Sequence, residues 1–150
     1  MKKTVTIILF LCLLIMIIGS ALTPKNMDGD ITGDIVAPDD VKIILKKSCY
    51  DCHSFETKYP FYSKIFPVSL LINNHIKEGR EEINFSTFEQ LSDTKKSSKL
   101  KSLVEDIESN EMPLFGYTLL HPDAVLSDEE KIILIEWAKS ISGDGEDDEN

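Results

Sequence analysis

Two cysteines and a histidine stand together in the segment Cys49-Tyr50-Asp51-Cys52-His53. Two thiols at this spacing can add to the two vinyl groups of one porphyrin, and a histidine directly after them can ligate its iron. The pattern C-x-x-C-H is typical of c-type haem attachment. We therefore predict one covalent haem, attached at Cys49 and Cys52, with His53 as the proximal iron ligand.

Two other uses of the cysteines compete with haem. Structural zinc usually needs a second closely spaced pair of Cys or His ligands, and the sequence has no second C-x-x-C. A thioredoxin-like dithiol is expected near a βαβ pattern, which we do not find. The third cysteine, Cys12, lies within an apolar run, so a framework of structural disulfides is excluded.

The 150-residue chain is long enough for one domain and is acidic, with a formal net charge of −10. An acidic surface argues against nucleic acid as a partner. If the chain has a redox partner protein, we expect that partner to present a basic or neutral surface.

The N-terminus combines Lys2 and Lys3 with an apolar run that ends near Leu22. This combination is typical of an exported chain, and Gly19-Ser20-Ala21 offers small residues to a signal peptidase. The run is also close to the roughly 20 residues that span a bilayer. Residues 1–22 are thus predicted to be a signal peptide or a membrane anchor. Both place the haem motif outside the cytoplasm.

The rest of the chain predicts an all-α domain over residues 38–142. It follows a linker over 23–37, rich in residues that favour turns, and precedes a disordered acidic tail over 143–150. The predicted helices begin at a cap formed by Asp39 or Asp40, after Pro67 with Gly79 as the C-cap, near Lys95, and at a capping box that starts with Ser127.

Several short motifs together resemble the haem-binding domain family of exported bacterial proteins. They are Cys49 to Ser54, Tyr59-Pro60-Phe61-Tyr62, His75 to Arg80, Asn84-Phe85-Ser86, Met112 to Tyr117, and His121-Pro122. The resemblance covers about residues 38–142. It implies a small, cytochrome c-like helical domain around one haem, in the periplasm or on the outer face of the cytoplasmic membrane of a bacterium.

Three residues are candidates for the sixth iron ligand. Met112 is preferred, because it precedes Pro113 in an irregular segment and a Met thioether raises the reduction potential of haem. His75, on a predicted helix, is the alternative, and His121 is the third candidate.

Two further contacts with the haem site are predicted. Arg80 can form a bidentate pair with a haem propionate, or it can be a solvated surface residue. The carbonyl of Pro60 can accept a hydrogen bond from Nδ1 of His53 and so orient the imidazole.

The expected function is electron transfer by a six-coordinate haem. A peroxidase-like enzyme is the alternative, with His75 or His121 together with Arg80 as acid–base groups near an open iron site. A haem-based sensor of a small gas is a further alternative. How firmly the sixth position is occupied separates these functions.

Overall fold

The computed structural model describes residues 2–23 and 29–143, and every regular element within these ranges is a helix. The all-α prediction is therefore confirmed. Most of the predicted tail at 143–150 lies outside the described residues. The elements are α1 (Lys2–Leu22), α2 (Asp39–Ser48), α3 (Tyr50–His53), η1 (Phe61–Lys64), α4 (Val68–Glu82), η2 (Phe85–Gln90), α5 (Asp93–Glu108), α6 (Phe115–Thr118), η3 (Pro122–Ala124) and α7 (Asp128–Ser142).

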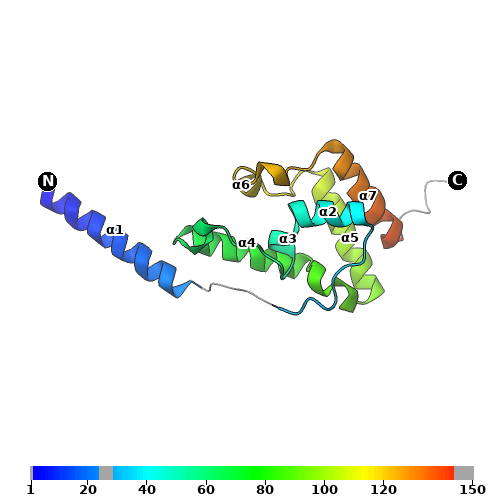
Figure 1. The fold of residues 1–150 in the computed structure, drawn as a ribbon, viewed down its shortest axis with the longest axis horizontal. Coiled ribbons are helices and arrows are strands. Elements are labelled where there is room, and N and C mark those ends of the chain that lie inside the picture. Colours follow the sequence, from blue (N-terminus) through cyan, green and yellow to red (C-terminus); the bar gives the residue numbers. More distant parts are fainter. Residues whose placement is uncertain (1, 24–28, 144–150) are drawn as a thin grey trace.

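The hydrophobic core lies where α2, α5 and α7 meet (Figure 1). Each helix contributes one apolar stripe, as expected for helices that bury one face. The buried side chains from these helices are Val41, Ile44, Leu45, Leu100, Val104, Ile107, Leu134, Trp137 and Ala138. Because α2 is held in this core, the haem motif that follows it starts from a fixed position.

Helix α4 packs against α3, the short helix that carries the haem motif. In Figure 1, α4 extends from the core toward α1. Phe85 in η2, which follows α4, is completely buried and stacks on Tyr50 with ring centroids 5.3 Å apart. This stacking joins the haem motif to the segment after α4.

Part of the predicted linker packs against the domain. The backbone N–H of Ile35 donates to the carbonyl of Phe85 at 2.8 Å, and the carbonyl of Gly33 accepts from Glu89 N–H at 2.8 Å. Ile35 is only 2% exposed and belongs to the core. The packed part of the chain thus begins before Pro38, because one apolar side chain in a polar segment is buried. Residues 24–28 of the predicted linker lie outside the described residues.

Two predicted helix ends are wrong. Pro38 occupies the N-cap of α2, while Asp39 and Asp40 lie in its first turn, where their charges favour the positive end of the helix dipole. Gly79 is not a C-cap, because α4 continues to Glu82. Gly79 is instead buried within the helix, against the haem motif.

The capping box of α7 is confirmed. Ser127 Oγ accepts from Glu130 N–H at 3.2 Å, and the Glu130 carboxylate accepts from Ser127 N–H at 2.9 Å. Two backbone donors at the start of the helix are thereby satisfied.

Replacing the cap tests how much α7 depends on it. We expect Ser127→Ala to lower the free energy of unfolding by about 1 kcal/mol, since a donor of the first turn loses its partner. Ser127→Asn keeps an acceptor and is the matched control. Chemical denaturation followed by circular dichroism measures both variants, and equal stability would contradict the role of the cap.

Candidate functional site

A cavity of about 360 Å³ opens beside the haem motif. Its walls come from the end of α2, from α3, α4 and α5, and from the segment at 112–117. Among the predicted site residues it is lined by Cys49, Cys52, His53, His75 and Met112. The structure thus brings together residues that are up to 63 positions apart in the sequence, as the span from Cys49 to Met112 shows.

The other walls of the cavity are mainly apolar. Phe85, Leu103, Ile107, Leu114 and Leu126 contribute to them. An apolar cavity beside two thiols and a histidine suits a porphyrin, because removing the apolar surface of the ring from water is favourable.

The imidazole of His53 is oriented by the backbone that follows α4. Nδ1 lies 3.2 Å from the carbonyl oxygen of Ile83, so a neutral ring protonated at Nδ1 donates there and can offer Nε2 to a metal. The prediction for Pro60 is wrong, because its carbonyl accepts from the backbone and side chain of Ser63. Desolvation lowers the pKa of His53, which favours the neutral form that a metal ligand needs.

Gly79 allows α4 to approach the haem motif closely. A Cβ at this position would lie 3.1 Å from the carbonyl oxygen of Cys52 and 3.3 Å from Cε1 of His53. These distances are shorter than ordinary contacts, so a larger side chain would displace the predicted iron ligand. The glycine is required for a close approach of two backbones.

The two thiols are held in the neutral state in the folded chain. Desolvation raises the pKa of Cys49 to about 12 and that of Cys52 to about 11. Among residues 2–23 and 29–143, no group of three or more His, Cys, Asp or Glu side chains is placed to hold a metal ion. Cys49 and Cys52 are therefore not joined there by the further ligands that structural zinc takes.

Arg80 holds the segment that leaves the haem motif. Its Nε donates to the carbonyl of Ser54 at 2.8 Å, one terminal nitrogen donates to Thr57 Oγ1 at 3.0 Å, and the guanidinium lies over the ring of Phe55. Arg80 is not among the residues that line the cavity. The pairing of Arg80 with a haem propionate stays a prediction.

Met112 and His75 both line the cavity, so both remain candidates for the sixth position. The backbone N–H of Met112 donates to the carbonyl of Asp106 on α5 at 3.2 Å, which fixes the segment that carries the thioether. His121 is not a lining residue; its Nε2 lies 2.6 Å from the Tyr62 hydroxyl, and its ring stacks on Tyr117.

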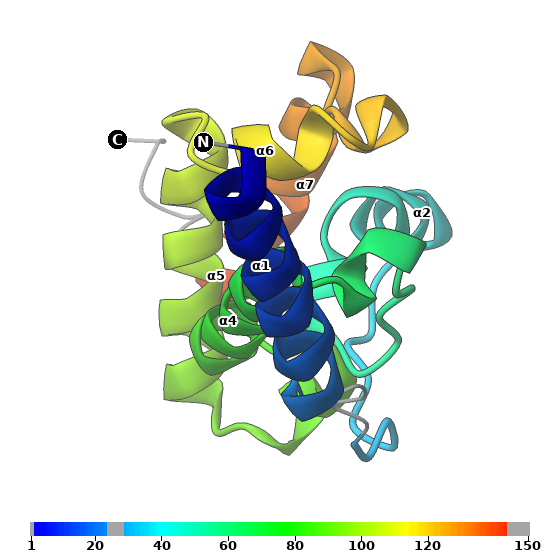
Figure 2. The same ribbon diagram turned by 90° about the vertical axis from the view of Figure 1, so that its left-hand side faces the viewer.

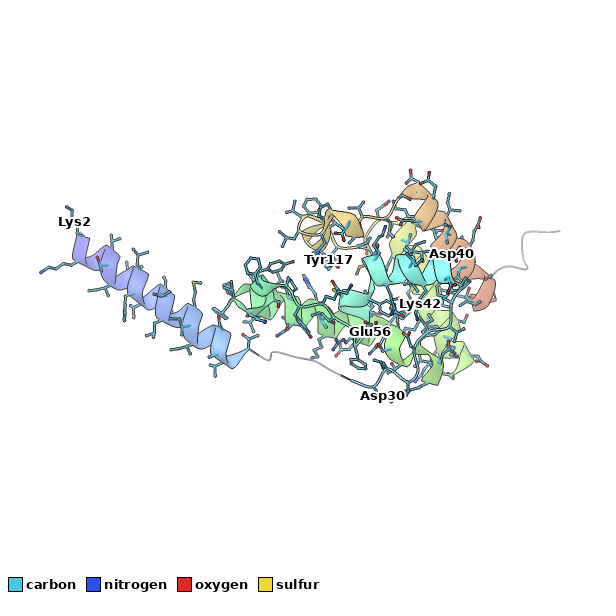
Figure 3. All side chains as sticks on the ribbon, viewed as in Figure 1. Lys2, Asp30, Asp40, Lys42, Glu56 and Tyr117 are labelled. Atoms are coloured by element: carbon cyan, nitrogen blue, oxygen red, sulfur yellow. The ribbon has the colours of Figure 1, made fainter. Side chains whose placement is uncertain are left out.

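Sequence reasoning missed the polar link between the haem motif and the Met112 segment. The hydroxyl of Tyr117 donates to the carboxylate of Asp51 at 2.8 Å. In Figure 3, Tyr117 lies on the side of α6 that faces α3. Both residues belong to motifs recognised in the sequence, but their spacing does not reveal that they meet.

Charged residues at the cavity were also missed. Glu78 and Glu82 from α4 and Asp106 from α5 line it, together with Lys99 from α5. Lys99 Nζ donates to the carbonyl of Glu81 at 3.0 Å. Their positions follow from how α4 and α5 pack, and nothing in their local sequence distinguishes them from other surface charges.

A helical domain in which a C-x-x-C-H segment borders an apolar cavity defines a haem-binding class of protein. The family model of the haem-binding domain matches residues 8–140, and the chain belongs to this family. The resemblance noted in the motifs is thereby confirmed. No curated protein and no solved structure matches the chain.

The contact at Gly79 predicts a strong effect of substitution. We expect Gly79→Leu to reduce the fraction of chains that carry haem, because the new side chain would push against Cys52 and His53. Gly116→Leu is the matched control, since a Cβ at Gly116 meets no atom within 4 Å. The haem absorbance per mole of purified protein measures the effect, and equal haem content in both variants would contradict it.

Proposed function

We propose that this protein is an exported mono-haem c-type cytochrome that carries electrons. The observation that carries the proposal is that Cys49, Cys52, His53 and Met112 line the same cavity. In this proposal the two sulfurs form thioether bonds to the haem, and His53 and Met112 ligate its iron. The family match supports haem as the cofactor.

Haem supplies an iron whose oxidation state can change reversibly by one electron. The chain's part is to hold that iron and to tune it. His53 is fixed through Ile83, so its Nε2 has one orientation. Met112 is fixed through Asp106, so its thioether is supplied from an anchored segment. Ligands held in this way need to move little when the electron arrives or leaves.

The charges around the cavity tune the electron affinity of the site. Glu78, Glu82 and Asp106 place three carboxylates against one ammonium group, that of Lys99. Net negative charge near the iron stabilises the ferric over the ferrous state and therefore lowers the reduction potential. The same charge favours a basic or neutral redox partner over an acidic one.

Electron transfer is favoured over peroxidase chemistry by the positions of the polar residues. A peroxidase needs an acid–base pair beside an open iron site. Arg80 is engaged with Ser54 and Thr57, and neither Arg80 nor His121 lines the cavity. Of the acid–base residues named for the peroxidase hypothesis, only His75 lines the cavity.

Covalent attachment is tested by mass spectrometry. Full-length protein made with the haem-attachment machinery should gain the mass of one haem, and this mass should survive acid–organic extraction. Cys49→Ala with Cys52→Ala is the control that should lose it. An unmodified mass of the wild type, or bound zinc in place of haem, would refute the proposal.

The iron ligands are tested by comparing Met112→Ala with His75→Ala. Met112→Ala should abolish the near-infrared charge-transfer band of the ferric protein and lower the reduction potential, because a thioether favours ferrous iron. His75→Ala should keep the band. The opposite pattern would indicate bis-His ligation and a carrier of lower potential. Rapid binding of carbon monoxide by the ferrous wild type would favour the sensor or peroxidase function instead.

A further inference from the structure

The C-terminal end of α1 is packed against the domain. Gly19 lies so close to Phe66 that a Cβ would come within 2.4 Å of the ring. Ser20 Oγ accepts from the backbone N–H of Phe66 at 2.9 Å. Thr23 is hydrogen-bonded to the buried Ser69 at 3.1 Å between their hydroxyl oxygens. Two of the small residues that resemble a cleavage site, Gly19 and Ser20, are therefore residues through which α1 contacts the domain.

The domain exposes large apolar side chains at the end from which α1 projects. Phe61 in η1 is 79% exposed, Leu71 in α4 is 57% exposed, and Phe115 in α6 is 79% exposed. The hydrogen bond between Tyr62 and His121 ties η1 to the segment after α6. Figure 1 shows the start of α4 and α6 at this end, and in Figure 2 the end faces the viewer, with α1 in front.

This end also lacks acidic residues, although the chain has 26 Asp and Glu. Neither residues 59–77 nor residues 112–122 contain one, and the charged residues in these ranges are Lys64 and Lys77. We call these two ranges the apolar end. It therefore combines exposed apolar side chains with a local charge that anionic headgroups would not repel.

We propose that the apolar end rests in the interface of a lipid bilayer that α1 spans. Helix α1 has 21 residues, a mean hydropathy of 2.9 and no buried part, so its length and composition suit a membrane span. Its contact with Phe66 and Ser69 brings the exposed apolar side chains to the membrane surface, where burial of apolar area stabilises association. The family match begins at residue 8, inside α1. The proposal does not depend on the haem chemistry.

Retention of α1 is tested first. The intact mass of the full chain purified from membranes should include residues 1–22. A mass that corresponds to cleavage near Ala21 would overturn the proposal, because the apolar end would then have lost its connection to the bilayer.

Contact with lipid is tested on the full chain in nanodiscs of phosphatidylcholine and phosphatidylglycerol that contain a diazirine-bearing phospholipid. After irradiation, mass spectrometry should locate cross-links in α1 and in the apolar end. Exposed Ile132 and Ile141 on α7 are internal controls and should carry none. Cross-links confined to α1, or protein–protein cross-links that cover the apolar end in their place, would overturn the proposal.

A pair of variants tests the contact between α1 and the domain. Gly19→Leu would collide with Phe66, and we expect it to reduce cross-linking of the apolar end at least several-fold while α1 is cross-linked as before. Ala21→Leu, at an exposed position of the same helix, is the matched control. A far-UV circular dichroism spectrum like that of the wild type shows that each variant is folded. Equal cross-linking of the apolar end in both variants would contradict a docked α1.

Discussion

The close packing of α3 on α4 at Gly79 is the contact on which the site depends. It brings the backbone of Cys52 and the ring of His53 against a helix that has no side chain at this point. The next turn of backbone supplies the Ile83 carbonyl that orients the imidazole. The short helix α3, which has little stability of its own, is thus held in place by the longer helix α4.

The motifs that are separate in the sequence form one connected structure. Arg80 on α4 donates a hydrogen bond to Ser54, directly after the haem motif. Tyr117 on α6 donates a hydrogen bond to Asp51, inside the motif. Each contact joins the haem motif to a different wall of the cavity. The residues around the two cysteines therefore position the cavity walls as well as the sulfurs.

The segment at 112–120 contributes to two surfaces. Met112 and Tyr117 line the cavity, whereas Phe115 and Leu119 are exposed at 79% and 67%. Short helical turns can divide their side chains in this way because successive residues point in different directions. The same few residues therefore connect the candidate iron site with the apolar end of the domain.

The sequence alone predicted what local physics controls: the all-α class and the capping box at Ser127. It also identified the C-x-x-C-H segment as the candidate haem site, because that pattern is a matter of local spacing. Tertiary packing decided the rest. In the sequence Gly79 resembles a helix C-cap, but α4 continues past it to Glu82. The lack of a side chain at Gly79 instead allows α4 to approach Cys52 closely. The carbonyl that serves His53 belongs to Ile83, 30 residues away. Any residue can offer a backbone carbonyl, so its position follows only from the folded chain.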